Sequence, residues 1–339
     1  MKMPNPIIEI KPLGFPWETR DPFLFCVHHL DTYPKANANL GPDAPLDGRN
    51  IGHDFVVKDG WRMYHGSKVP GFPSHPHRGF ETITIVQKGL IDHSDSMGAA
   101  ARFGNGDVQW MTAGKGVQHS EMFPLLSREG DNPLELFQIW LNLPRSGKFV
   151  DPYFLMLWNE NIPVLKVLDE YGKKTSVKIV AGKYKETNAP DPPPDSWASD
   201  ADHDVSIWVI TLEPDAHWTL PAASEGVNRT LYFFEGNTLA ASGQMIPPYK
   251  GMDLEPTSEL PLRNGGTQSR LLLLQGKPIG EPVVQHGPFV MNTEAEIRQT
   301  MTDYRETQFG GWPWPSHEHV HPEDRGRFAR YADGTEEVK

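Results

Sequence analysis

The sequence predicts an all-β protein built from two similar barrels. Short apolar runs alternate with turn residues along most of the chain, which is typical of strands rather than of helices. The 31 glycines and 32 prolines are spread out instead of clustered, as many tight turns require. The 339 residues exceed what one compact core usually holds, so two domains are expected.

The expected strands form two series. The first contains the segments HDFVVKDG, ETITIVQKG, DVQWMTAG and ELFQIWLNLP, and the second contains TSVKIVAGKY, DVSIWVITLEPD, RTLYFFEG and SRLLLLQGKP. FETITIVQKG ends at Gly89 and NRTLYFFEG ends at Gly236, which aligns the two series as a duplication. Helical segments do not alternate with these strands, so a parallel sheet is disfavoured. We expect an N-terminal barrel over residues 1–150 and a C-terminal barrel over residues 151–310.

One short helix is expected late in the chain. Thr293 and Glu296 form a capping-box pattern at the start of NTEAEIRQTMTDY. Apolar residues recur on one face of this helix, which should therefore pack against a barrel; they are Ile297, Met301 and Tyr304. The remaining segment, 311–339, is charged and rich in turn residues, which predicts a loosely packed tail.

The composition argues against several classes of partner. The net charge is -12, which gives no general attraction to nucleic acid or to anionic lipid. A single cysteine, Cys26, excludes an intramolecular disulfide, and its expected role is that of a small apolar residue in a reducing compartment. No apolar run suggests a secretory signal or a membrane span. A cytoplasmic protein without direct contact to DNA or membrane is expected.

Two pairs of potential metal ligands stand out. PSHPHRGFE places His75 and His77 two residues apart, and HSE places His119 and Glu121 two residues apart, 44 residues further on in each case. On strands, residues at this spacing point to one face. Two such pairs on adjacent strands could converge inside a barrel, where four polar groups without a metal would be costly to bury.

The chemistry of this set favours a catalytic or sensing metal. It offers nitrogen and oxygen but no thiolate, which suits Fe(II), Mn, Ni, Co or Cu(II) better than a structural zinc. Four protein ligands on a metal that prefers five or six would leave positions open for a substrate or O₂.

The same residues resemble a known family. PGFPSHPHRGFETITIVQKG and GDVQWMTAGKGVQHSEMF closely resemble the pirin family of the cupin superfamily, and KPIGEPVVQHGPFVMNT resembles its C-terminal half. The resemblance covers about residues 5–310. It implies two cupin (jelly-roll) barrels that face each other, with one non-haem iron in the N-terminal barrel. The implied ligands are His75, His77, His119 and Glu121.

The resemblance leaves a choice between two carboxylates. The broader cupin pattern H-x-H-x-x-x-E would nominate Glu81, whereas the closer pirin match nominates Glu121. We expect Glu121 to be the ligand and Glu81 to lie in the second shell. In the C-terminal barrel, the positions that correspond to the two histidines are Ala222 and Ser224, so that barrel is expected to lack a metal site and to serve a structural role.

Other histidines and aromatic residues receive simpler interpretations. His93 is interpreted as an ordinary turn histidine, and one of Trp110 and Met111 should face the pocket. The adjacent His28 and His29 must point in opposite directions on a strand, so they cannot serve one centre. The alternating tail histidines could bind a surface metal, although a solvated tail is favoured; they are His317, His319 and His321.

The resemblance implies an oxidoreductase of the quercetin 2,3-dioxygenase type. A flavonol or related enol would bind the metal and lose its hydroxyl proton, Glu121 could accept that proton, and O₂ would open the ring. The alternative is a redox-sensing iron protein that acts as a transcriptional co-regulator through protein partners. The family resemblance also suggests a monomer.

Overall fold

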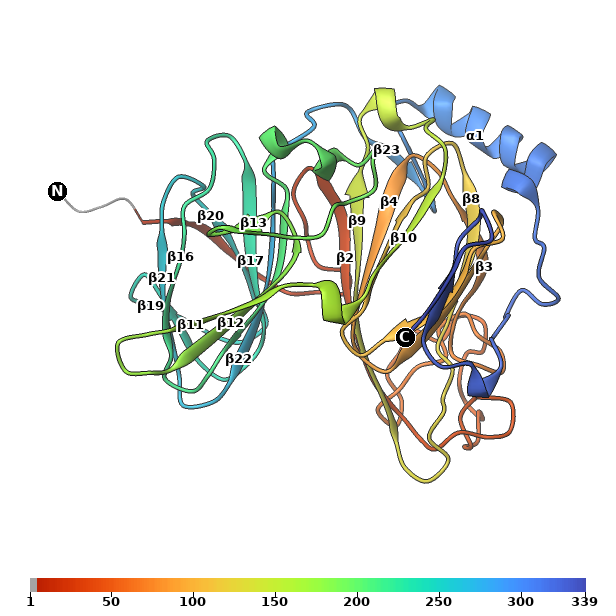
Figure 1. Cartoon of the computed structure of the whole chain (residues 1–339), viewed down its shortest axis with the longest axis horizontal. Coiled ribbons are helices and arrows are strands. Elements are labelled where there is room, and N and C mark those ends of the chain that lie inside the picture. Colours follow the sequence, from red (N-terminus) through yellow and green to blue (C-terminus); the bar gives the residue numbers. More distant parts are fainter. Residues whose placement is uncertain (1–4) are drawn as a thin grey trace. The chain divides into compact units, whose positions relative to one another are not determined.

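The computed structural model describes residues 5–339 and divides the chain into two units (Figure 1). Val27–Asn159 and Glu281–Lys339 form one unit, which we call the histidine barrel. Residues 5–26 and Glu160–Gly280 form the other, which we call the second barrel. These boundaries differ from a division near residue 150, because each end of the chain joins the barrel formed by the other half.

Two antiparallel sheets form the histidine barrel. One has the order β10 (Tyr153–Leu157), β7 (Val108–Thr112), β4 (Phe80–Lys88), β9 (Asn132–Asn142) and β2 (Phe23–Tyr33). The other has the order β26 (Glu336–Val338), β25 (Phe328–Arg330), β6 (Ala100–Gly104), β5 (Leu90–Asp95), β8 (Val117–Met122) and β3 (Gly71–His77). A shared core joins them, since Val86 and Leu136 of the first sheet cluster with Ile91 and Phe103 of the second.

The second barrel is also built from two antiparallel sheets. One has the order β1 (Ile7–Pro12), β20 (Lys250–Leu254), β17 (Asn228–Glu235), β22 (Ser269–Gly276), β15 (Ser206–Leu212), β12 (Lys174–Ala181) and β11 (Val164–Leu168). The other has the order β16 (His217–Leu220), β21 (Leu260–Asn264), β18 (Leu239–Ala241) and β19 (Gln244–Ile246). One apolar cluster draws on both sheets and includes Leu231, Leu271, Trp218 and Leu260. The all-β fold with two cupin barrels is thus confirmed.

Seven of the eight expected strand segments are strands, and one is not. HDFVVKDG forms only isolated bridges, between Asp54 and Tyr64 and between Lys58 and Trp61. Asp59 has a positive φ of 55° and its two valines, Val56 and Val57, are 77% and 55% exposed. A turn and two solvated side chains leave this segment without the apolar face that a strand buries.

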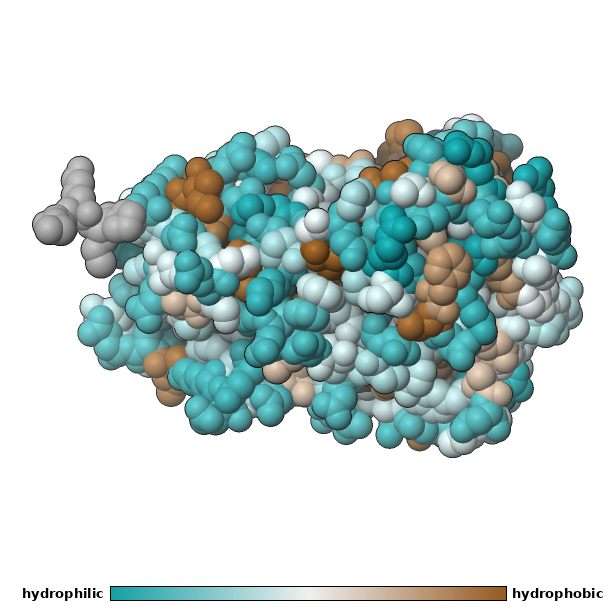
Figure 2. Space-filling model, turned by 90° about the horizontal axis from the view of Figure 1, so that it is seen from above, coloured by the Kyte–Doolittle hydropathy of each residue, from teal (hydrophilic) through white to brown (hydrophobic). Residues whose placement is uncertain are grey.

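The expected helix is confirmed as α1 (Glu294–Thr307). The Thr293 side chain accepts a hydrogen bond from the backbone N–H of Glu296, and Ile297 packs on β24 (Phe289–Met291), which pairs with β23 (Val284–His286). Among residues 5–339, no helix is long and apolar enough to cross a membrane. The face drawn in Figure 2 is mostly hydrophilic, with apolar side chains in small separate groups.

The end of the chain is not the loosely packed tail that its composition predicts. Arg102 forms a fully buried ion pair with Asp92 and also donates to the carbonyl oxygen of His321. The backbone N–H of His321 donates to Asp92, and β25 pairs with β6. Charge and turn residues suggest exposure, but here a buried cation satisfies the carbonyl groups of the tail and holds it on the sheet.

Candidate metal centre

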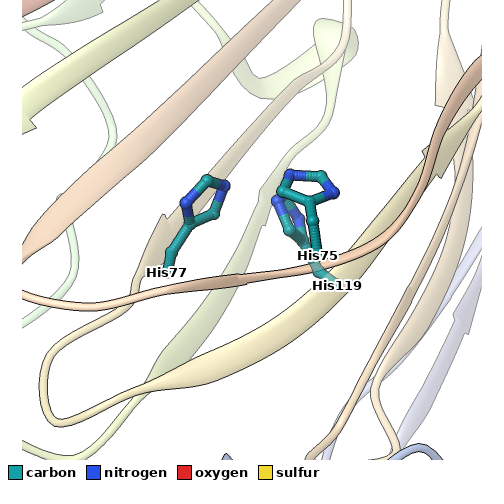
Figure 3. A group of neighbouring side chains, drawn as sticks. All are labelled: His75, His77 and His119. Atoms are coloured by element: carbon teal, nitrogen blue, oxygen red, sulfur yellow. The ribbon is translucent and has the colours of Figure 1, made fainter. Parts of the chain in front are cut away.

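The pairing of β3 with β8 brings three histidines together. His75 lies directly opposite His119 in the antiparallel register, so both side chains share one face with His77. The ring centroids are 4.5 Å apart for His75 and His119 and 4.7 Å apart for His75 and His77. One ligand atom from each residue lies within 4.8 Å of the others, and the three rings stand on the same side of the strands (Figure 3).

Backbone carbonyl groups orient two of these rings. The Nδ1 atom of His75 lies 2.8 Å from the carbonyl oxygen of Pro73, and the Nδ1 atom of His77 lies 3.4 Å from that of Pro288. A carbonyl oxygen can only accept, so Nδ1 carries the proton and Nε2 keeps its lone pair in each ring. Metal-binding histidines are commonly held by such a second hydrogen bond.

His119 has unsatisfied ring nitrogens that a ligand could bind. It is fully buried, and neither Nδ1 nor Nε2 has a hydrogen-bond partner among residues 5–339. Burial lowers the pKa of all three imidazoles, that of His75 to about 4, so they are neutral at pH 7. Three converging neutral nitrogens, one of them without any partner, fit a divalent transition metal.

Glu121 shares the inward face but points toward the opposite sheet. Its Oε2 atom is 3.9 Å from Nε2 of His119, so it lies beside the histidine cluster rather than within it. Oε1 accepts a hydrogen bond from Thr84 at 3.0 Å, and Oε2 accepts one from Gln138 at 3.3 Å. The structure thus brings together three of the four expected ligands and places the fourth next to them. Burial raises the pKa of Glu121.

The hydrogen bonds around Glu121 suit a group that exchanges a proton. The Thr84 hydroxyl lies 3.0 Å from Oε1 of Glu121 and 2.7 Å from Oε1 of Gln138, but it has one proton and can donate to only one of them. When Glu121 is protonated it can donate to Thr84, which then donates to Gln138. When Glu121 is ionised, Thr84 donates to it instead, and Oε1 of Gln138 loses that donor. Thr84 can therefore bond to either form of Glu121, as an acceptor or as a donor.

Glu81, which the cupin pattern nominates as the ligand and which we expected in the second shell, faces away from the histidine cluster. Thr84 faces the cluster, so Glu81, three residues earlier on the same strand, faces the other side of the sheet. There it accepts a hydrogen bond from Thr112 at 2.7 Å. The same alternation decides between two neighbours on β7: Met111 packs inward with Val117, and Trp110 faces away.

His93 is not the ordinary turn histidine that the sequence suggests. It lies on β5 rather than in a turn, is fully buried, and stands opposite Glu121 in the register. Its ring is 5.5 Å from that of His119 and forms hydrogen bonds with Asp95 and Gln109, each at 3.0 Å. The alternation of Ile91, His93 and Asp95 was the available signal, but only the β5–β8 pairing places it beside the cluster.

Aromatic side chains line the cluster. The ring centroid of Phe80 lies 5.0 Å from that of His77. The ring centroid of Trp140 lies 5.4 Å from that of His77 and 4.3 Å from that of Phe80. On the other side, Phe72 lies 6.3 Å from His75. His75 and Trp140 are partly exposed, whereas His119 is not. A flat aromatic molecule could therefore approach the cluster from the side of His75 and Trp140.

The other histidines that drew attention lie apart from this centre. His28 bonds to Glu135 and His29 to Tyr64, in opposite directions as expected. The tail histidines have separate partners: His317 contacts Ser74, His319 stacks on Trp314, and His321 reaches the carbonyl oxygen of His93. In the second barrel, Ala222 and Ser224 are exposed in the loop before β17. Across residues 5–339, the only group of three or more candidate ligands is the one described above.

Comparisons with known proteins identify relatives that match most of the chain. A pirin profile matches residues 18–141, and a profile described as the pirin C-terminal cupin domain matches residues 207–310. A Pseudomonas aeruginosa protein named "Putative quercetin 2,3-dioxygenase" is 34% identical over 70% of this chain and 79% of its own length. A pirin-like protein of Solanum lycopersicum is 35% identical over 80% of this chain and 89% of its own.

A solved structure agrees with these sequence matches. The crystal structure of a quercetin 2,3-dioxygenase from Acinetobacter baumannii superposes with a TM-score of 0.68 at 26% identity, covering 91% of this chain and 96% of that one. The relatives exceed 30% identity over more than two thirds of the chain, and the profile matches fall in both halves. The chain belongs to the pirin family.

Proposed function

We propose that this protein is a metal-dependent oxidoreductase that cleaves a flavonol or a related enol with O₂, in the manner of quercetin 2,3-dioxygenase. The observation that carries the proposal is the fully buried His119, whose two ring nitrogens lack partners beside two rings with oriented Nε2 atoms. His75, His77 and His119 would hold one divalent metal, Fe(II) in the first instance, with Glu121 as the fourth ligand. When bound, such a metal lowers the pKa of an enol hydroxyl and makes O₂ chemistry available.

Glu121 is assigned the proton transfer. An enol hydroxyl held next to His119 would lie near Oε2 of Glu121, which is 3.9 Å from Nε2 of that histidine. Glu121 would accept the hydroxyl proton, and its hydrogen bonds with Thr84 and Gln138 accommodate it before and after the transfer. The negative charge left on the enol oxygen makes the substrate electron-rich, which is the form that reacts with O₂.

The substrate class follows from the walls of the site and from the relatives. Phe80 and Trp140 offer aromatic faces beside His77, on which a planar ring system could stack. The names of the P. aeruginosa relative and of the A. baumannii structure refer to quercetin 2,3-dioxygenase. Both observations support a flavonol-like substrate for this chain.

The test measures metal content and oxygen uptake together. Purified wild-type protein, reconstituted with Fe(II) and analysed by mass spectrometry, should bind one metal ion and consume O₂ when quercetin is added. His119→Ala should lose most of the metal and the oxygen uptake. Glu81→Gln is the matched control, because Glu81 faces away from the cluster, and should keep its metal. Metal-replete wild-type protein that consumes no oxygen would refute the dioxygenase.

A further inference from the structure

In the part of the chain that the structure describes, one buried arginine of the second barrel lacks hydrogen-bond partners at two of its guanidinium nitrogens. Arg229 lies on β17 and is 1% exposed. It shares its strand face with Leu231 and Phe233, which belong to the apolar core, so its side chain points into the barrel. Its Nε and Nη1 atoms have no hydrogen-bond partner among residues 5–339. Burial lowers its pKa to about 10, so the guanidinium is still charged at neutral pH.

Other buried arginines in this chain are paired. Arg62 donates to both oxygens of Asp31 at 2.9 and 3.1 Å, and Arg102 donates to both oxygens of Asp92 at 2.7 and 2.8 Å. A buried cation that lacks such a partner destabilises the fold, because its hydration is lost without compensation. Arg229 therefore presents a charged donor group in a position where an anion would stabilise it.

Two further polar atoms that lack a hydrogen-bond partner among the described residues face the same interior. Gln275 on β22 is directly opposite Arg229, and its Oε1 atom is buried without a hydrogen-bond partner. Trp208 on β15 is one residue pair further along the same face, and its indole N–H has no partner either. Arg229 and Trp208 can donate, and Gln275 can accept. A ligand for this face would carry acceptors and one donor.

The duplication gives the position a counterpart in the histidine barrel. Counted back from Gly236, Arg229 corresponds to Thr82, which lies seven residues before Gly89. Thr82 pairs with Trp140, as Arg229 pairs with Gln275. Since Trp140 contacts the histidine cluster, Arg229 and Gln275 occupy the interior position that lines the site in the other barrel.

The charges around Arg229 select the class of anion. Asp204 is the acidic group that affects Arg229, and it raises the pKa of the guanidinium. Its carboxylate oxygens accept from Gln275 at 2.9 Å and from the backbone N–H of Ser224 at 2.9 Å, and within residues 5–339 it forms no ion pair with Arg229. A dianion would add two negative charges beside Asp204 and a monoanion only one, so Asp204 repels a monoanion less.

We propose that the interior of the second barrel binds a small hydroxycarboxylic acid, whose carboxylate accepts from Arg229 and whose hydroxyl donates to Oε1 of Gln275. The site is separate from the histidine cluster and does not depend on a metal. The proposal makes the second barrel a ligand-binding domain. A carboxylate matches the planar donor fork of arginine, and a hydroxyl supplies the donor that Gln275 lacks.

The experiment compares wild type, Arg229→Met and Arg263→Gln in a chloride-containing HEPES buffer. Arg263 is exposed on β21 of the same barrel, so its variant is the matched control. Isothermal titration with lactate should show binding to wild type and to Arg263→Gln, and at least about a 50-fold loss of affinity for Arg229→Met, because the charged contact is removed. Acetate, which lacks the hydroxyl, and sulfate, which is a dianion, should bind more weakly than lactate.

Thermal unfolding supplies a second readout, because lactate should reverse the order of the unfolding temperatures of wild type and Arg229→Met. Without ligand, Arg229→Met should unfold at or above the wild-type temperature, since an apolar side chain replaces an unpaired buried charge. At a lactate concentration about 100 times the dissociation constant, wild type should gain about 5 °C and overtake the variant.

Several results would overturn the proposal. If wild-type protein neither binds lactate nor is stabilised by it, the guanidinium of Arg229 is satisfied by water alone and the proposal is wrong. Equal binding to Arg229→Met would place the anion elsewhere, and tighter binding of sulfate would contradict the monocarboxylate class. If Arg229→Met does not fold, a crystal structure of wild type grown with lactate decides: planar density at Nε of Arg229 is expected, and a lone water there would refute the site.

Discussion

The buried imidazole of His119, whose ring nitrogens have no hydrogen-bond partner within residues 5–339, is the strongest evidence for a metal site. The spacing of 44 residues between PSHPH and HSE predicted that two pairs of side chains could meet, and the structure brings the three histidines together. The sequence could not decide the facing of the carboxylates, because that depends on strand register. Successive residues of a strand point to opposite faces. Glu121 therefore lies on the inward face, where it bonds to Thr84, and Glu81 lies on the outward face, where it bonds to Thr112.

The lowered pKa of His75 predicts a pH-dependent stability. The unfolded chain binds a proton at this residue below about pH 6.5, but the native protein does so only near pH 4. The free energy of unfolding of the metal-free protein should therefore be constant above about pH 6.5 and fall below it, by up to about 1.4 kcal/mol per pH unit for this one proton.

Urea unfolding at pH 7, 5.5 and 4.5 would measure this effect. The comparison protein is His75→Gln, which has no titrating group at this position in either state. The stability of wild type relative to His75→Gln should decrease as the pH is lowered through this window. Two curves that stay parallel from pH 7 to 4.5 would show that His75 does not contribute.

Thr84 should tune the proton affinity of Glu121. Thr84→Val removes the hydroxyl that donates to Oε1 of Glu121, and a carboxylate that loses a hydrogen bond has a higher pKa. The acidic limb of the pH–rate profile for oxygen uptake should move to higher pH, and kcat at pH 7 should fall about 10-fold. Thr82→Val is the control, since the Thr82 hydroxyl is on the same face of β4 but has no hydrogen-bond partner within residues 5–339. An identical shift in both variants would argue against this role.

Among the elements, the local sequence pattern predicted most strands and the helix, but it did not predict the packing of the tail. Short apolar runs bounded by turn residues predicted β4, β9, β17 and β22, and the capping box predicted the start of α1 at Thr293. The segment 311–339 has no such pattern. Its order comes from Arg102, a residue more than 200 positions earlier in the chain that donates to three of its carbonyl groups. Such a partner is visible only in three dimensions.

Arg102 should hold the tail in place. Arg102→Met leaves the buried Asp92 without its ion-pair partner, which should lower the free energy of unfolding by about 3–5 kcal/mol. Limited proteolysis should then cleave within residues 311–325 before the rest of the chain is digested.

Arg128 offers a matched comparison for this prediction. It reaches the tail at Glu323, but both side chains are about half exposed, so Arg128→Gln should change stability by less than about 1 kcal/mol. Equal proteolytic sensitivity of the two variants would contradict the role given to the buried pair.

For the whole molecule, metal binding should stabilise one barrel selectively. A metal that binds only the native state raises its stability by mass action, and the candidate ligands all lie in the histidine barrel. Hydrogen exchange should therefore slow in peptides from β3 and β8 when Fe(II) is added without O₂. Peptides from β15 and β22 of the second barrel should exchange at the same rate. Protection that is equal in both barrels would contradict this assignment.

The duplication was readable in the sequence, but the composition of each barrel was not. Two aligned strand series predicted two barrels, and both are present. The sequence could not show that β1 pairs with β20, because about 240 residues separate these strands, nor that residues 281–339 complete the first half. Pairings across such separations leave no local pattern.

This interlaced order has a consequence for biosynthesis. As the chain leaves the ribosome, His75, His77 and His119 emerge early, but Pro288, whose carbonyl group orients His77, comes more than 200 residues after that histidine. The second barrel has all its strands once residue 280 has emerged. The cell would therefore complete the metal-binding half last, so that a prematurely terminated product would contain the histidines without the support that aims them.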